Sequence, residues 1–522
     1  MQNFYDAART LADIPDLHAG GTALIFQGRH TSYPDLAQAA NRMANAMAAQ
    51  GLAPGARVGF LGLDSDKSYE ILFGCARAAM VFVPVNWKLT AEEMEFIVRD
   101  AECELLFVTP ETAQPAQDLR ARCPRLRAVV VIGGAAAGLT GYAGLRDAAP
   151  AVRPAVPIEP GTPVVQIYTS GTSGKPKGVV LGHRGFIDTV REIVRASDEF
   201  IEWTPRDVSL LTLPTFHVGG LWWAMQGLIN GAANVVMKAF DSAEALGAIA
   251  QYRITKLAFV PAMLRFLLSD PACAATDLSS VDFIIYGGAP MALPLLDKAQ
   301  ARLRCRFAHN YGMSETTNMA IFMPPSEHAA ATGQRRTSAG RPVRGVRVRI
   351  VDGEGRGLAP GESGEIHFHT PTRMLEYWKR PEATAETLVD GWIHTGDAGY
   401  MDEDGYLYIT DRIKDVVISA GENISPAELE QVLLTHPAID EAAVIGVPDK
   451  RWGEVPIAYV VPVSGSGLTR ADVMAHARGR IASFKMIYDA ILVERLPRNA
   501  TGKVLKRVLR EPHWAGQERQ VN

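Results

Sequence analysis

Hydroxyls, glycines and lysines alternate in one short segment, residues 168–178, which reads Tyr168-Thr169-Ser170-Gly171-Thr172-Ser173-Gly174-Lys175-Pro176-Lys177-Gly178. The glycines allow the backbone to approach a ligand closely, so that main-chain N–H groups can point at an anion. Four hydroxyls and two ammonium groups supply further donors. The segment therefore predicts a loop that binds the phosphates of a nucleotide or of another polyphosphate.

A Walker A loop is the obvious alternative, and the spacing excludes it. That motif needs Gly five positions before the Gly-Lys pair and Ser or Thr directly after the Lys, where this chain has Thr169 and Pro176. Both flanks, 164–168 and 178–181, have the apolar, β-branched composition of strands. A flexible Gly/Ser linker is the other alternative, but linkers rarely lie between buried strands. We predict a strand–loop–strand phosphate site.

Length and composition limit the class of protein. A chain of 522 residues is too long for one core and should form two or more domains. The chain has 47% hydrophobic residues, 21% charged residues and a net charge of −4. It therefore lacks the basic excess that is typical of nucleic-acid-binding proteins. No apolar run reaches the roughly 18 residues of a membrane span, and the N-terminus lacks a signal-peptide pattern, so we expect a cytoplasmic protein. The five cysteines form no metal or disulfide pattern and are expected to be buried thiols.

Strand-like and helix-like segments alternate from about residue 20 to 400, which indicates an α/β fold. Examples are a strand at 57–63, a helix at 69–80 and a strand at 81–85. A strand at 282–286 ends in Gly287-Gly288-Ala289, and the next strand ends near Asn310-Tyr311-Gly312. Ligands of such sheets bind beyond the carboxyl ends of the strands. We therefore expect these two loops to share one crevice.

The pattern changes near residue 410, where a charged break, 411–415, follows a strand-like segment. Ser425-Pro426-Ala427-Glu428 has the capping hydroxyl, first-turn proline and reciprocal glutamate of a helix start. Two strands, a further helix at 471–481 and a strand at 490–494 follow. We expect a large N-terminal domain, 1–411, of stacked mixed sheets and helices, and a small mobile α+β domain, 412–522.

Taken together, these motifs resemble the acyl- and aryl-CoA synthetases of the adenylate-forming (ANL) superfamily over nearly the whole chain. The family's motifs correspond, in order, to 168–178, 214–220, 287–290, 310–315, 392–397, 411–430 and 497–503. Three departures are Ser314 for a common threonine, Glu376 for a frequent glycine, and His369-Thr370 for a frequent Arg-Gly. The resemblance implies that a carboxylate attacks the α-phosphate of ATP to give acyl-AMP and pyrophosphate, and that CoA thiolate then displaces AMP.

The resemblance also implies a role for each motif. Lys503 would bridge the substrate carboxylate and the α-phosphate, where cations stabilise the charge of the transferring phosphoryl group. Glu315, with Thr169, would hold Mg²⁺. His217 would lie at the acyl or pantetheine tunnel, although a histidine in an apolar segment is often a hydrogen-bonded core residue. Lys414 would be the hinge of the small domain. The implied nucleotide and CoA contacts are Thr169, Ser170, Gly171, Thr172, Ser173, Gly174, Lys177, Gly287, Gly288, Ala289, Asn310, Tyr311, Gly312, Met313, Ser314, Asp397, Arg412, Lys414 and Gly421.

Two other functions stay open beside a carboxylate–CoA ligase: an adenylase that loads a carrier protein or acts oxidatively, and a non-catalytic nucleotide sensor. Apolar residues after the phosphate loop, Phe216, Val218, Leu221, Trp222 and Trp223, suggest an apolar pocket. A fatty acid of medium or longer chain is the expected substrate, with an aryl or other hydrophobic acid as the alternative. The expected partners are ATP, CoA and this acid, without nucleic acid or a membrane span; a homodimer is one assembly that the sequence allows.

Overall fold

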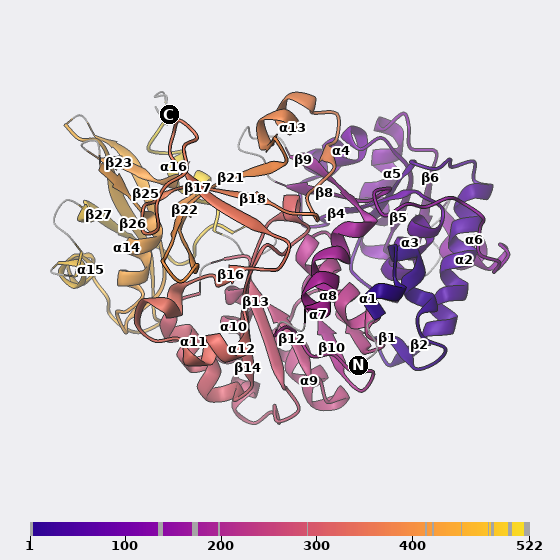
Figure 1. Cartoon of the computed structure of the whole chain (residues 1–522), viewed down its shortest axis with the longest axis horizontal. Coiled ribbons are helices and arrows are strands. Elements are labelled where there is room, and N and C mark those ends of the chain that lie inside the picture. The colour runs from indigo at the N-terminus through magenta and orange to yellow at the C-terminus, as the bar shows by residue number, and fades with distance from the viewer. Residues whose placement is uncertain are drawn as a thin grey trace.

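The computed structural model in Figure 1 follows the chain from an indigo N-terminus to a yellow C-terminus. It describes residues 4–133, 139–169, 176–196, 199–289, 291–412, 415–419, 422–449, 451–478, 480–481, 485–498 and 504–515. The strands of these residues form four sheets. Two large sheets and one small sheet belong to the N-terminal domain, and the fourth sheet forms the smaller C-terminal domain at the left of the view.

The first large sheet has nine strands, with parallel strands in its centre and antiparallel strands at both edges. In spatial order they are β16 (Arg341–Pro342), β15 (Ile321–Met323), β14 (Arg306–Tyr311), β13 (Phe283–Gly287), β12 (Lys256–Phe259), β10 (Val208–Leu211), β11 (Ala233–Val236), β1 (Thr22–Phe26) and β2 (Arg29–Ser32). The central strands are apolar because helices cover both faces of parallel strands. Four of the five residues of β13 are buried.

The second large sheet has eight strands and carries the predicted phosphate loop. In spatial order they are β19 (Glu376–Tyr377), β9 (Lys177–Gly182), β8 (Pro163–Thr169), β4 (Val81–Val85), β3 (Arg57–Leu61), β5 (Cys103–Val108), β6 (Ala128–Val131) and β7 (Thr140–Gly141). The strands from β8 to β7 run parallel, whereas β9 and β19 are antiparallel additions at one edge.

Both large sheets contribute to one hydrophobic core, which includes Phe60 of β3 and Phe283 of β13. Helix α8 (Val218–Ile229) lies in this core and is buried along eleven of its twelve residues. The other helices of the N-terminal domain are α1 (Phe4–Ala7), α2 (Tyr33–Ala49), α3 (Asp66–Arg77), α4 (Ala91–Asp100), α5 (Ala113–Arg122), α6 (Tyr142–Asp147), α7 (Asp188–Arg195), α9 (Ser242–Tyr252), α10 (Pro261–Ser269), α11 (Leu293–Leu303), α12 (Pro325–Ala330) and α13 (Pro381–Thr387).

Two five-stranded sheets complete the structure, and β22 leads from one to the other. The first contains β17 (Arg347–Val351), β18 (Gly364–His369), β21 (Trp392–Met401), β20 (Leu388–Val389) and β22 (Leu407–Arg412). The C-terminal sheet contains β24 (Glu422–Ile424), β23 (Val417–Ser419), β26 (Gly453–Pro462), β25 (Ile439–Asp449) and β27 (Asp489–Leu492). Three helices contact this sheet: α14 (Pro426–Leu433), α15 (Arg470–Ala477) and α16 (Lys506–Arg510). Two separate hydrophobic clusters give the C-terminal domain its own core.

The predicted α/β organisation is confirmed, and the differences lie at the ends of helices and strands. The strand predicted at 57–63, for example, ends at Leu61. Helix α3 begins at Asp66, three residues before the predicted start, because Ser65 caps it by accepting from Lys67 N at 3.2 Å. Ser425 caps α14 as predicted, accepting from Glu428 N at 3.3 Å. The Glu428 carboxylate binds the Lys485 ammonium at 2.7 Å, where the sequence predicted a reciprocal bond to the cap. A full charge is the stronger partner for a carboxylate.

Candidate active site

The predicted phosphate loop joins the antiparallel strands β8 and β9, whose facing ends are Thr169 and Lys177. This arrangement confirms the predicted strand–loop–strand pattern. Both end residues are half-buried. The loop positions between them, Ser170, Gly171, Thr172, Ser173 and Gly174, lie outside the described residues.

Tyr377 connects this loop to the predicted metal ligand Glu315. The Glu315 side chain is 6% exposed, and its Oε1 accepts the Tyr377 hydroxyl at 2.6 Å. On the other side, Lys177 Nζ lies 5.1 Å from the centre of the Tyr377 ring, and Tyr377 pairs with Val179 of β9. The sequence analysis did not single out Tyr377. The structure makes it the side chain that positions Glu315.

The donors in this region fit a magnesium–nucleotide complex. Mg²⁺ prefers oxygen ligands and is usually held by one or two carboxylates together with substrate phosphates and waters. Glu315 offers a buried carboxylate and Thr169 a hydroxyl at the end of the loop. No imidazole or thiol is needed for such a site.

The two predicted adenine loops are adjacent in space. Gly287, at the end of β13, is the register partner of Asn310 in β14. A Cβ at Gly287 would lie 2.2 Å from the carbonyl oxygen of Asn310, so only glycine permits this approach. Among the described residues, the buried Oδ1 of Asn310 has no hydrogen-bond partner. Such an acceptor is costly unless a ligand satisfies it, and an adenine amino group is a suitable donor.

Tyr311 links the adenine loop to the predicted ribose motif. Its hydroxyl donates to Asp397 Oδ2 at 2.6 Å, and its ring lies 5.7 Å from that of Phe368. Asp397 is 5% exposed, and its N–H donates to Thr395 Oγ1 at 3.0 Å. Arg412 of β22 is the register partner of Asp397, although its side chain is outside the described part of the chain. The structure thus brings three predicted contacts together.

The rest of the second adenine loop turns tightly next to Glu315. A Cβ at Gly312 would lie 1.9 Å from the Asn318 carbonyl oxygen, which explains this glycine. Met313 N donates to Thr316 Oγ1 at 3.0 Å, and both Met313 and Ser314 are half-buried. In the first loop, Gly288 is exposed with a φ of 77°, and Ala289 is half-buried.

His217 precedes α8 and has an enclosed imidazole nitrogen. Burial, together with the positive charge of Lys88, lowers the pKa of His217 to about 3, so the ring is neutral at pH 7. Its buried Nε2 has no hydrogen-bond partner among the described residues. Asp64, which the sequence did not indicate, holds the preceding turn by accepting from Thr215 N at 2.9 Å and Thr215 Oγ1 at 2.5 Å. Burial raises the pKa of this carboxyl to about 7.

The expected apolar pocket is only partly present. Phe216 lines a cavity of about 30 Å³, together with Asp64 and aromatic and methionine side chains that include Trp87, Met237, Phe240 and Met263. Trp222 and Trp223 belong to the core instead: Trp223 is 1% exposed, and its ring lies 5.2 Å from that of Trp203. Both tryptophans belong to the hydrophobic core that the two large sheets share, and neither lines this cavity.

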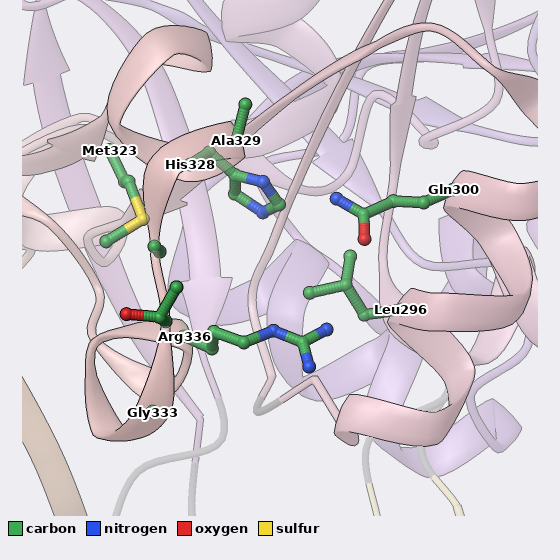
Figure 2. A pocket seen from close by; sticks show the side chains of 9 residues that line it. Leu296, Gln300, Met323, His328, Ala329, Gly333 and Arg336 are labelled. Atoms are coloured by element: carbon green, nitrogen blue, oxygen red, sulfur yellow. The ribbon is translucent and has the colours of Figure 1, made fainter.

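A larger cavity, of about 410 Å³, lies between α11, α12 and η6 (Gly333–Thr337). Figure 2 shows Leu296, Gln300, His328 and Arg336 around it. It contains none of the predicted site residues. Its connection to the adenine loops is His328 Nε2, which lies 2.9 Å from the hydroxyl of Tyr286, the residue before Gly287.

Three predicted residues of the C-terminal motifs, Lys414, Gly421 and Lys503, lie outside the described residues. The neighbouring part of the boundary is described. Asp411 is 8% exposed, and its Oδ2 accepts from Ala427 N at 3.0 Å at the start of α14. Ser425 Oγ donates to Thr410 O at 2.6 Å. These bonds join β22 to the first helix of the C-terminal domain.

Comparison with known proteins agrees with this geometry. Residues 13–378 match the AMP-binding enzyme family, and residues 428–503 match the AMP-binding enzyme C-terminal domain. The chain is 44% identical over 500 residues to the fatty acid–[acyl-carrier-protein] ligase ScoC of Streptomyces coeruleorubidus. The aligned region covers 96% of this chain and 95% of that protein.

None of the helices within the described residues combines the length and hydrophobicity that a bilayer crossing needs.

Two solved structures are similar over almost the whole chain. The anthranilate CoA ligase AuaEII in complex with anthranoyl-AMP has a TM-score of 0.89 and 25% identity, covering 98% of this chain and 99% of that chain. ATP-bound MatB from Rhodopseudomonas palustris has a TM-score of 0.86 and 30% identity, with the same coverage of both chains. The chain therefore belongs to the AMP-binding enzyme family of the adenylate-forming superfamily and is an ATP-binding, AMP-forming acyl-CoA ligase.

Proposed function

We propose that this ligase activates a fatty acid of medium or long chain and transfers the acyl group to CoA in the cytoplasm, where both co-substrates are available. In the first step a carboxylate oxygen bonds to the α-phosphorus of ATP, and pyrophosphate leaves. In the second step the CoA thiolate bonds to the acyl carbon, and AMP leaves with the bonding electron pair. The thiol proton passes to solvent.

The hydrogen bond between Tyr311 and Asp397 carries this proposal, because it joins the two segments that would hold adenosine. Asn310 would accept from the adenine amino group, and Asp397 with Arg412 would bind the ribose hydroxyls. Glu315, oriented by Tyr377, would hold Mg²⁺ with Thr169. Residues 170–174, together with Lys177, would donate to the β- and γ-phosphates. Magnesium would neutralise phosphate charge as pyrophosphate departs.

The C-terminal domain would supply Lys503 for the first step and Gly421 for the second. We place the domain boundary at residues 411 and 412 and the hinge at Lys414. This assignment is supported by the position of Lys414 two residues after the end of β22. Hinges absorb backbone change at the ends of such elements. The bonds from Asp411 and Thr410 to the start of α14 span the hinge, so they would have to break when the small domain rotates.

The nature of the acid follows from two observations. The cavity beside Phe216 is lined by aromatic and methionine side chains together with the ionisable side chains of Asp64, Lys88 and Lys238, and the 44% identical relative is named for fatty acids. A volume of about 30 Å³ holds little more than a water molecule or two, so an acyl chain must displace side chains to enter. Met237 and Met263 are suited to this because methionine side chains are flexible. His217, neutral at pH 7, would border the path of the acyl or pantetheine group.

Two alternatives have specific support. The same relative is named for an acyl carrier protein as its acceptor, which favours a carrier thiol in place of CoA. The similarity to the anthranilate CoA ligase favours an aryl acid.

A screen of fatty acids from C6 to C18 and of aryl acids, read by pyrophosphate release, separates the acids. Each active acid is then offered free CoA or a holo carrier protein, and thiol consumption identifies the acceptor. The proposal expects the highest rate with a fatty acid of C8 or longer and with free CoA. Faster release with an aryl acid, or consumption of the carrier thiol alone, would overturn it in favour of the corresponding alternative.

A further inference from the structure

Three metal-ligating side chains converge on one face of the strand pair β18–β21. His367 and His394 are register partners across the pair, and Glu365 precedes His367 by two residues. Residues two apart in a strand lie on the same face. One ligand atom from each of Glu365, His367 and His394 lies within 4.8 Å of the other two. None of these residues has a role in the adenylation site described above.

The two imidazoles have unused nitrogen atoms. His367 is 2% exposed, and its ring stacks on that of His394 with 3.8 Å between centroids and 12° between planes. The Nε2 atoms of both rings are buried without a hydrogen-bond partner among the described residues. His367 Nε2 is 3.2 Å from Glu365 Oε2 but lacks the alignment of a hydrogen bond. Buried polar atoms are normally satisfied, so these two require an explanation.

We propose that Glu365, His367 and His394 form a binding site for Zn²⁺ that is separate from the magnesium–nucleotide site. Two imidazoles and one carboxylate are a ligand set that zinc accepts with a water in the fourth position. Magnesium prefers oxygen donors and would not compete well here. Because the lone pair of each nitrogen lies in the plane of its ring, one imidazole must turn out of the stack. His394 is the ring expected to turn, because it is half-buried whereas His367 is buried.

In the absence of metal, Arg349 determines which nitrogen of the His367 ring carries the hydrogen. Its Nε donates to His367 Nδ1 at 3.3 Å, which places the imidazole hydrogen on Nε2. When zinc binds Nε2, that hydrogen moves to Nδ1, and Arg349 must withdraw towards the Trp392 ring, whose centre is already 4.4 Å from its guanidinium carbon. Arg349 therefore opposes metal binding through its charge and through its hydrogen bond.

Glu365 couples this site to the ribose motif. Its Oε1 accepts from Gly396 N at 3.0 Å, directly before Asp397. A zinc ion that draws the carboxylate towards the imidazoles would shift this bond and the Asp397 side chain that follows. Zinc should therefore raise the KM for ATP. This effect rests on the proposed role of Asp397, whereas zinc binding itself does not.

Binding is tested on the full-length protein after treatment with EDTA, by competition for Zn²⁺ with a chromophoric chelator. We expect one zinc ion per chain and, because loss of an outer-shell partner alone can cost 10–100-fold in affinity, at least about tenfold weaker binding in Glu365→Gln and His394→Ala. His369→Ala is the matched control, since His369 lies on the same strand and face but outside the cluster. Arg349→Met should bind zinc more tightly than the wild type.

One result would overturn zinc binding at these residues, and a separate result would overturn its coupling to ATP. Equal zinc affinity in the wild type and in His394→Ala would show that zinc binds elsewhere, for example at the half-buried Cys305. Circular dichroism of each variant confirms that it is folded. For the coupling, zinc should raise the KM for ATP in the wild type and in His369→Ala but not in Glu365→Gln; an equal rise in all three contradicts the link through Gly396.

Discussion

The Tyr311 hydroxyl donates to Asp397 Oδ2 at 2.6 Å, although the two residues are 86 positions apart in the sequence. This bond fixes the ribose carboxylate relative to the adenine loop. Tyr311→Phe removes one hydrogen bond to a charged acceptor, worth about 1.5–3 kcal/mol. We expect a rise of about tenfold or more in the KM for ATP and a larger rise in Asp397→Ala.

Steady-state kinetics at varied ATP concentration measures this effect. Tyr408→Phe is a suitable control, because Tyr408 donates to Asp402 at 3.0 Å in the same small sheet but away from the nucleotide loops. Equal ATP dependence in all four proteins would show that Asp397 is a turn residue without a ligand.

Tyr377→Phe tests the positioning of Glu315. The substitution keeps the ring near Lys177 but removes the 2.6 Å hydrogen bond that orients the carboxylate. Because Glu315 would hold Mg²⁺, we expect the magnesium concentration for half-maximal adenylation to increase several-fold. Tyr406→Phe removes a similar bond to Glu327, 2.8 Å long and remote from the predicted site, and should leave the magnesium dependence unchanged. The assignment fails if both variants respond alike.

Glu441 of β25 connects the two domains through Arg265 of α10, with which it forms an ion pair. Within its own domain it also pairs, at 2.5 Å, with Arg498 of the predicted lysine motif. The Arg265 and Glu441 side chains are only 17% and 14% exposed, so solvent screens this contact less than a surface pair. Glu441→Gln should destabilise this domain orientation by about 1 kcal/mol and change the ratio of the two half-reaction rates about fivefold.

Rapid-quench measurements of acyl-AMP formation and of thioester formation from supplied acyl-AMP give this ratio. Asp277→Asn removes the exposed pair with Arg253 within the N-terminal domain and serves as the control. A ratio in Glu441→Gln that matches the control would exclude a role for Glu441 in domain orientation.

Buried neutral histidines should make stability depend on pH. Burial lowers the pKa of His183, His309 and His328 to about 4 and that of His217 to about 3. The unfolded chain binds protons to these rings below pH 6.5 and the folded chain does not, so the free energy of unfolding falls as pH decreases from 6.5 towards 4. Each fully titrating ring contributes about 1.4 kcal/mol per pH unit.

Urea unfolding at pH 7.5, 6 and 5 measures this loss, and the dependence should flatten above pH 7. Replacing His328 with glutamine, which retains an amide to meet the Tyr286 hydroxyl, should reduce the slope below pH 6.5. A midpoint that is constant from pH 7.5 to 5 would contradict the neutral state of these rings.

The motifs predicted the strands and loops around the candidate site because local patterns determine these elements. The strand–loop–strand flanks of 168–178 and the paired ends of β13 and β14 follow from hydrophobic patterning and from glycine at close approach. The core position of Trp222 and Trp223 could not be predicted, because an apolar segment fits a pocket and a core equally well. Tyr377 and the pairing of His367 with His394 depend on strand register across long sequence separations, which composition does not determine.

The stoichiometry of the complete reaction tests the central claim most directly. With ATP, Mg²⁺, free CoA and the preferred fatty acid, the account predicts one pyrophosphate, one AMP and one thioester formed for each CoA thiol consumed. Pyrophosphate and acyl-AMP formation without consumption of the CoA thiol, under conditions in which a holo carrier protein becomes acylated, would contradict a carboxylate–CoA ligase.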